Sequence, residues 1–109
     1  MVEKSIIKEV ERYLRTVKET GISVRFGVIF GSRVTGGAKD DSDIDLIVVS
    51  PDFDGKRDRK KMGRLWHVAS ETDYRIEPIP CGEKQWLEDE STPIIEAARQ
   101  NGQMVAVPE

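Results

Sequence analysis

The chain has 109 residues, 38% of them hydrophobic and 34% charged, and a formal net charge of −3 at pH 7. This length predicts a single domain over residues 1–109, and the small net charge gives no general reason for tight, unspecific binding to nucleic acid. No apolar run could cross a bilayer, no secretory signal opens the chain, and Cys81 is the only cysteine, so we expect a cytoplasmic protein without disulfides or a cysteine-based zinc site.

The first half of the chain predicts a helix followed by two strands. Apolar residues recur at intervals of three and four over residues 3–19, which is typical of an amphipathic helix. Residues 23–30 are rich in Val, Ile and Phe and predict a strand that stops at Gly31. A short polar connection with one helical turn leads to a second apolar strand over residues 44–49, which the following Ser-Pro pair ends.

The second half of the chain predicts two more helices and two more strands. The expected elements are a helix over residues 56–69, a strand over 73–80, a helix over 93–101 and a short strand over 104–107. Trp66 belongs to the apolar side of the first of these helices, and a basic run lies on its other side. Two prolines in the first of these strands favour an edge position or an end near Pro78.

Together these elements predict an α/β or α+β fold. The sheet has three or four strands, is covered by helices, and includes some antiparallel pairing because several connections are short. The sequence contains no internal repeat, low-complexity tract or interdomain linker. We therefore expect one small sheet with one site.

Two aspartates at the start of the second strand carry the strongest chemical signal. Asp43 and Asp45 are one residue apart, so in an extended chain their side chains leave the same face, with Cβ atoms roughly 6–7 Å apart. Carboxylates held this close repel each other unless a cation lies between them. Hard oxygen ligands suit Mg²⁺, which completes its shell with water and substrate phosphates. The pair therefore predicts a magnesium site.

A polar turn or a calcium loop would account for only part of this acidic stretch. Asp40 and Asp41 are expected to form only a polar turn before the strand. A calcium-binding EF-hand would match the spacing of Asp41, Asp43 and Asp45, but Leu46 stands where that loop needs glycine. No helix-loop-helix frame surrounds the stretch either, so we do not expect a calcium loop.

The Gly31-Ser32 pair lies at the end of the preceding strand, one short loop before the aspartates. Glycine allows a sharp turn and the close approach of a ligand, and a serine that opens a helical turn offers its hydroxyl and nearby N–H groups. The pair therefore suggests a phosphate-binding turn. The sequence has neither GxxxxGK[ST] nor GxGxxG, so a P-loop or a dinucleotide-binding site is not expected.

These parts combine into a site for phosphoryl chemistry. A nucleoside triphosphate held at Gly31-Ser32 would be bridged to Asp43 and Asp45 through Mg²⁺. A third carboxylate would help to hold a second ion and to position an acceptor hydroxyl. Glu77 is the first candidate for this role and Asp73 the second, since both are expected on the polar face of the third strand.

The residues of this site resemble a known family. Gly31-Ser32, ten residues and then Asp43-Ile44-Asp45 match the GSx10DxD signature of the minimal nucleotidyltransferases, a branch of the DNA polymerase β-like superfamily. The order of elements agrees over most of the chain. The resemblance implies a small mixed sheet flanked by helices, as in the polymerase β palm, two Mg²⁺ ions, and transfer of a nucleoside monophosphate from an NTP, often ATP, with release of pyrophosphate.

The resemblance also implies a role for each matching residue. Gly31 and Ser32 would contact the β and γ phosphates, with Arg33 as a less specific assistant. Asp43 and Asp45 would bind metal. The third carboxylate would come from the next core strand, which points to Glu77 or Asp73. A glutamate there departs from an aspartate rule, and this departure bears on activity, since some members of the superfamily lose one acid.

Many minimal nucleotidyltransferases resemble antitoxins that pair with a helical HEPN partner, which some of them adenylylate on tyrosine. The chain has no accessory substrate domain of its own, so a protein partner, a HEPN-type toxin, is expected to supply the acceptor. His67, Trp66 and Trp86 are possible lining residues of such a surface, although a satisfied histidine and half-buried indoles are the favoured interpretation.

The sequence therefore supports three hypotheses for function. The first is an active Mg²⁺-dependent nucleotidyltransferase, and the second is a catalytically degenerate module that neutralises a partner by binding it. The third is an RNA-binding protein that uses residues 56–64, which carry six basic side chains and one acidic one. The third is not favoured, because the basic run explains nothing about residues 31–45.

Overall fold

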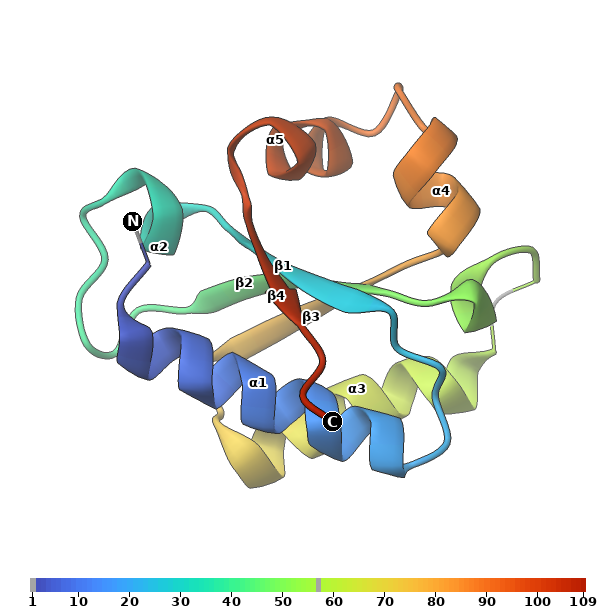
Figure 1. Cartoon of the computed structure of the whole chain (residues 1–109), viewed down its shortest axis with the longest axis horizontal. Helices are drawn as coiled ribbons and strands as arrows, with labels where there is room; N and C mark the ends of the chain where they lie inside the picture. Colours follow the sequence, from blue (N-terminus) through green and yellow to red (C-terminus); the bar gives the residue numbers. More distant parts are fainter. Residues whose placement is uncertain (1, 57) are drawn as a thin grey trace.

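The computed structural model describes residues 2–56 and 58–109 and contains a mixed sheet of four strands (Figure 1). The strands are β1 (Phe26–Phe30), β2 (Ile44–Val49), β3 (Ile76–Cys81) and β4 (Gln103–Ala106). Their order is β3-β2-β1-β4, in which β1 is antiparallel to β2 and β4, and β2 is parallel to β3. The mixed α+β architecture expected from the sequence is confirmed.

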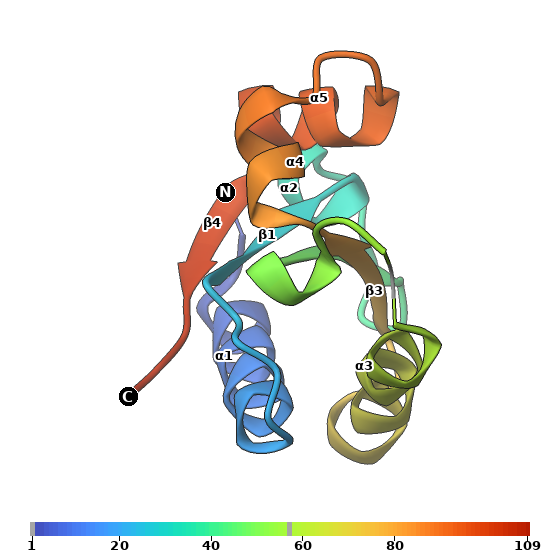
Figure 2. The same ribbon diagram turned by 90° about the vertical axis from the view of Figure 1, so that its right-hand side faces the viewer.

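Helices cover the two faces of the sheet unequally. The helical elements are α1 (Lys4–Glu19), the single turn α2 (Ser32–Thr35), the 3-10 turn η1 (Pro51–Phe53), α3 (Arg59–Thr72), α4 (Glu83–Glu88) and α5 (Pro93–Asn101). Figure 2 shows α1 and α3 side by side on one face and the shorter α4 and α5 on the other. No helix within the described ranges combines the length and the apolar character that a bilayer crossing needs.

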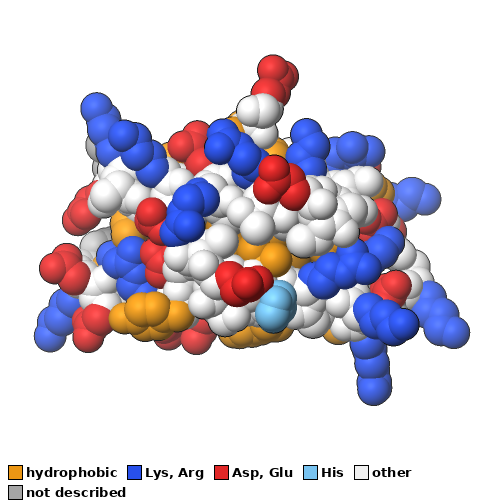
Figure 3. All heavy atoms as spheres, turned by 90° about the horizontal axis from the view of Figure 1, so that it is seen from below, with side chains coloured by type: hydrophobic (Ala, Val, Ile, Leu, Met, Phe, Trp, Pro, Cys, Tyr) orange, Lys and Arg blue, Asp and Glu red, His pale blue; other side chains and the backbone are white. Residues whose placement is uncertain are grey.

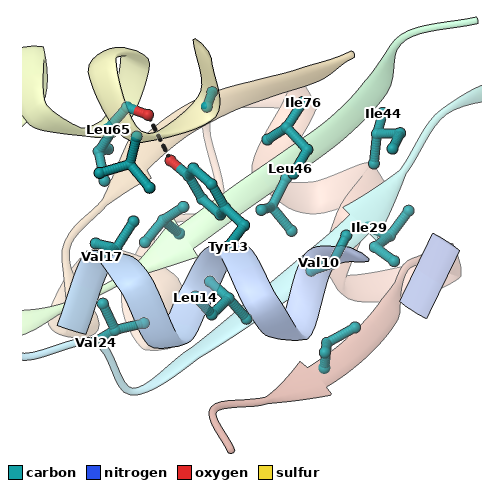
Figure 4. Close-up of a cluster of buried hydrophobic side chains, with 14 of the residues drawn as sticks. Val10, Tyr13, Leu14, Val17, Val24, Ile29, Ile44, Leu46, Leu65 and Ile76 are labelled. Atoms are coloured by element: carbon teal, nitrogen blue, oxygen red, sulfur yellow. Dashed lines mark hydrogen bonds between the residues drawn. The ribbon is translucent and has the colours of Figure 1, made fainter. Parts of the chain in front are cut away.

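The main core lies between the sheet and the α1–α3 layer (Figure 4). Alternate residues of β2 point into it, among them Ile44 and Leu46, because side chains alternate between the faces of a strand. Tyr13 of α1 is fully buried there, and its hydroxyl donates a 2.8 Å hydrogen bond to the carbonyl oxygen of Leu65 in α3. This bond satisfies the one polar atom of the ring and joins the two long helices.

A smaller core lies on the opposite face of the sheet, beneath α4 and α5. The buried members of this second cluster are Val28, Ile47, Val49, Cys81, Ile95 and Ala98. Residues 45, 47 and 49 of β2 all face this side, so the carboxylate of Asp45 shares a face with apolar neighbours. The second core therefore covers one end of this face, and the acidic residues occupy the other end.

Most predicted elements are confirmed, with shifted ends. The second strand has the bounds that were expected, and the helix predicted over residues 93–101 is α5. The first strand begins only at Phe26, and α3 runs later than expected because the Asp58 side chain accepts from the N–H groups of Lys60 and Lys61, which fixes the helix start. The helix α4 was not predicted.

The third strand lies later in the chain than its alternating pattern predicts. A strand is expected over residues 73–80, but β3 starts at Ile76 and continues to Cys81, so it does not end near Pro78. The N–H groups of Ile44 and Ser50 donate to the carbonyl oxygens of Arg75 and Cys81. The odd-numbered residues of β3 therefore make the backbone hydrogen bonds with β2. Pro78 and Pro80 therefore present their nitrogens, which lack hydrogen, to the outside, and the predicted edge position is confirmed.

Candidate active site

The pairing of β2 with β3 brings two carboxylates side by side. Asp45 is the register partner of Glu77 in this parallel pair, and Phe30 of β1 is its partner on the other side. Neighbouring strands lie about 4.8 Å apart, so the two acidic side chains leave the same face at adjacent positions. Asp43 comes immediately before β2, two residues from Asp45, and is exposed. The structure thus brings Asp43, Asp45 and Glu77 together at one end of the sheet face that carries the second core.

The charges of these three carboxylates act on one another. Partial burial raises the pKa of Asp45, and the charge of Asp43 raises it further. The charge of Asp43 is the main cause of a raised pKa at Glu77, followed by desolvation and the charge of Asp45. Burial and repulsion thus both disfavour the ionised forms, and a bound cation would relieve the repulsion.

The Gly31-Ser32 turn touches this acidic group directly. Gly31 has φ +75° and ψ −148°, a backbone conformation that essentially only glycine adopts. A Cβ atom placed on Gly31 would lie 2.5 Å from Oδ2 of Asp45, closer than any side chain tolerates. The positive φ therefore favours glycine here, and any side chain at this position would have to displace the Asp45 carboxylate.

The turn leads at once into the single helical turn α2. Ser32 is its first residue and is exposed, and the N–H groups of Val34 and Thr35 donate to the carbonyl oxygen of Gly31 at 3.0 Å. The first N–H groups of a helical turn have no partner within the turn, so those of Ser32 and Arg33 are not bonded within α2. Ser32 therefore directly follows the glycine that lies against the Asp45 carboxylate.

The side chain of Arg33 holds the loop before β2. Its Nη2 atom donates to the carbonyl oxygens of Ser42 at 2.6 Å and Asp40 at 3.2 Å, and its Nε atom is buried without a partner in the described part of the chain. The guanidinium is therefore occupied by the backbone next to Asp43. The structure gives it a positioning role, and phosphate contact by Arg33 stays a prediction from the resemblance.

A second arginine, which the sequence did not single out, holds the same loop from the other side. Nη1 of Arg75 donates to the carbonyl oxygen of Asp40 at 2.6 Å, while its Nε and Nη2 atoms bind the Asp73 carboxylate at 3.0 and 2.7 Å. The backbone before Asp43 is thus fixed between two guanidinium groups. The sequence gives no signal for this role, because Arg75 lies within the strand predicted over residues 73–80.

Asp73, the second candidate for a third carboxylate, does not join the acidic group. It lies at the C-terminal end of α3, before β3 begins, and is 9% exposed. Hydrogen bonds from Arg75 hold its pKa below the ordinary value. A carboxylate so paired is a structural link, and the register of β3 leaves Glu77 as the acid beside Asp45.

The carboxylates do not form a complete metal cage without other ligands. In residues 2–56 and 58–109, no group of three or more His, Cys, Asp or Glu side chains is arranged to hold a metal ion by itself. Magnesium is usually bound by one or two carboxylates together with water and substrate phosphates. Asp43 and Asp45, with an adjacent phosphate-binding turn, are a donor set of this second kind.

The raised pKa values predict how stability depends on pH. Ordinary values are 3.8 for Asp45 and 4.5 for Glu77, and both are raised in the folded chain. Their protonated forms therefore favour folding, and this contribution is lost as the pH rises through the raised values. We expect the stability advantage of Asp45→Asn over the native chain to grow between about pH 4 and 7, as measured by urea unfolding.

Asp73 supplies the matched control for this prediction, since its pKa is lowered rather than raised. Its contribution to stability is present above its ordinary value of 3.8 and is lost as the pH falls below it. Asp73→Asn should therefore be less stable than the native chain at pH 7, with a difference that shrinks in acid. If the stability of the two variants relative to the native chain changed with pH in the same direction, the raised pKa of Asp45 would be contradicted.

A family model described as "Nucleotidyltransferase domain" matches residues 6–100. The chain belongs to this family. The match spans both the Gly31-Ser32 turn and the three carboxylates, so the resemblance seen in the sequence is confirmed at the level of the nucleotidyltransferase family. No curated protein gives a match to the chain.

Two solved structures share the fold of this nucleotidyltransferase domain. One is a candidate nucleotidyltransferase from Sulfolobus solfataricus, with a TM-score of 0.55 and 23% identity over 72% of this chain and 68% of that one. The other is described as a toxin-antitoxin with AMP-PNP and has a TM-score of 0.60 and 20% identity over 91% of this chain and 74% of that one. At this identity the two structures establish the shared fold.

Proposed function

We propose that this nucleotidyltransferase domain transfers AMP from ATP to a hydroxyl group of a partner macromolecule in a Mg²⁺-dependent reaction. The observation that carries the proposal is the contact between Gly31 and Asp45, which joins a phosphate-binding turn to a carboxylate in register with Glu77. In-line transfer of a nucleotidyl group needs phosphate binding and metal-binding acids at one place. The family membership agrees with this chemistry.

In this proposal each residue of the site has a defined task. Asp43 and Asp45 hold the magnesium, with Glu77 as the third carboxylate for a second ion, and the Gly31-Ser32 turn receives the β and γ phosphates. Bound magnesium would neutralise phosphate charge and orient the reacting oxygens. The mutual repulsion of the acids and the first N–H groups of α2 fit these tasks.

The proposed reaction is a nucleophilic substitution at the α phosphorus of ATP. The acceptor hydroxyl oxygen forms a bond to this phosphorus, the bond to the bridging oxygen of pyrophosphate breaks, and pyrophosphate leaves with that electron pair. Glu77, which is exposed and in register with Asp45, would accept the hydroxyl proton. Arg33 and Arg75 keep the loop before Asp43 in place during this step.

We further propose that the acceptor lies on a protein partner, a toxin of HEPN type, and that this chain acts as its antitoxin in the cytoplasm. The support is the similar fold of a structure described as a toxin-antitoxin with AMP-PNP, an ATP analogue. The three acidic side chains at an exposed end of the sheet would face an acceptor supplied by that partner.

A transfer assay tests the proposal. The native chain, α-³²P-labelled ATP and the product of the neighbouring reading frame are incubated with Mg²⁺ or with EDTA, and labelled protein is separated on a gel. We expect label on the partner only with Mg²⁺. Absence of label under both conditions, with the partner still neutralised, would favour the alternative of a degenerate binding module, for which the glutamate at position 77 is the supporting observation.

A further inference from the structure

One side of α3 carries residues that the core does not use. Positions 59, 63, 66 and 70 recur at intervals of four and three, so they lie along one line on the helix surface. We call these residues the α3 stripe: Arg59, Gly63, Trp66 and Ser70. None of them is buried, whereas the buried residues of α3 point toward the sheet.

Trp66 is the most conspicuous member of the α3 stripe. The helical spacing favours a half-buried ring on the apolar side, but Trp66 is 55% exposed, because the neighbouring Leu65 takes the buried position. Tyr74, just beyond the helix, is 79% exposed. Two exposed aromatic rings on one surface are suited to stacking against flat ligands.

Gly63 leaves the helix surface bare next to this ring. A glycine in a helix interior lowers stability relative to alanine, so a packing reason is expected for it. Here nothing lies within 4 Å of the position that a Cβ would occupy, and packing therefore does not require glycine. The bare backbone lets a partner come close between Arg59 and Trp66.

Positive charge gathers at the start of the α3 stripe. Within residues 2–56 and 58–109, no ion pair or hydrogen bond engages the side chains of Lys56, Arg59 or Lys60, whereas Lys61 lies 3.6 Å from Asp52. Figure 3 shows Lys and Arg side chains at the end of this face where α3 begins. These cations are available for an anionic partner.

The other end of the α3 stripe lies at a cavity beside the loop that precedes β2. Ser70 lines an open cavity of about 470 Å³ together with Tyr74 and with Asp40 and Asp41 of the loop before β2. The stripe therefore runs from a basic end, past an exposed indole, to a cavity that adjoins the loop carrying Asp43.

We propose that the α3 stripe binds single-stranded nucleic acid. Phosphates would lie against Arg59 and its basic neighbours, and unstacked bases would stack on Trp66 and Tyr74. An oligoglutamate segment would satisfy the charge but has no flat ring to stack on the indole, and duplex DNA keeps its bases stacked away from it. Binding on this surface is separate from nucleotidyl transfer and does not depend on it.

Fluorescence anisotropy with a labelled oligouridylate of about 12 nucleotides tests the proposal with the full chain. Trp66→Ala should weaken binding about 5- to 150-fold, the loss of one stacked base, whereas Trp66→Phe should retain most of it. Arg59→Gln with Lys60→Gln should reduce the slope of log K against log salt by about 1.4, since each lost phosphate contact on a single strand removes about 0.7.

The matched control removes the same charge elsewhere. Lys4→Gln with Lys8→Gln lowers the net charge equally on α1, where both side chains are exposed, and should leave affinity and salt slope unchanged. Circular dichroism confirms that each variant is folded. The proposal is overturned if the oligonucleotide does not bind at about 50 mM salt, if Trp66→Ala binds like the native chain, or if the control equals the α3 variant. Equal or tighter binding of a duplex or of oligoglutamate would also overturn it.

Discussion

The Asp43→Asn, Asp45→Asn double variant will lose nucleotide transfer by at least about 10³-fold, while its fold becomes more stable in metal-free buffer at pH 7. The loss corresponds to about 4 kcal/mol of transition-state stabilisation, a magnitude ordinary for the removal of metal ligands. The gain in stability follows from the raised pKa values of Asp45 and Glu77, which burial of Asp45 and repulsion between the carboxylates cause in the folded chain. Because these carboxylates are partly exposed, removal of their charge should raise the free energy of unfolding by up to about 1 kcal/mol.

Transfer assays and urea unfolding of the same preparations measure both effects. The control variant is Asp40→Asn with Asp41→Asn, which removes two carboxylates from the exposed part of the loop and leaves Asp43 in place. It should keep its transfer activity. The expectation is contradicted if the site variant is less stable than the native chain, because loss of activity would then reflect a damaged fold rather than missing ligands.

The central part of the site could be predicted from the sequence because it depends on local spacing. The apolar run of β2 between Asp43 and Ser50 fixes both ends of the strand, and the one-residue interval of the aspartates fixes their common face. The position of Gly31 at the end of β1 placed the turn near them. Only the pairing of β1 with β2, which sets Phe30 opposite Asp45, was needed to create the contact.

The choice between Glu77 and Asp73 depended on information that is not local. Residues 73–80 alternate between polar and apolar as a strand does. In the structure, however, residues 73–75 form the connection before β3, in which Arg75 binds Asp73 and the loop before β2. Strand pairing then sets Ile76 opposite Ile44, and Glu77 comes beside Asp45 as a consequence. Alternation along one strand cannot reveal the register of its neighbour.

The helix α4 was missed for a similar reason. Its six residues are too few to show a hydrophobic period, and its start is stabilised from a distance. The Asp54 carboxylate, which follows η1, accepts hydrogen bonds from the N–H groups of Lys84 and Gln85. A cap supplied by a residue thirty positions earlier leaves no signature in the helix's own sequence.

Gly31→Ala should cost about 2–4 kcal/mol of unfolding free energy and abolish transfer. Alanine at φ +75° carries backbone strain of about 1–3 kcal/mol, and its Cβ would displace the Asp45 carboxylate, which costs further overpacking energy. Gly55→Ala is the matched control, since Gly55 has φ +69° and no atom within 4 Å of its Cβ position. The control should show the backbone strain alone and retain transfer.

A double-mutant cycle separates the two contributions at Gly31. In an Asp45→Ala background the colliding Oδ2 atom is absent, so Gly31→Ala should then cost about as much as Gly55→Ala. The coupling free energy between positions 31 and 45, measured by urea unfolding, should be about 1 kcal/mol or more, because contacting residues do not act additively. A coupling near zero would show that the turn and the carboxylate are independent. The proposed joining of phosphate and metal binding at this contact would then lose its basis.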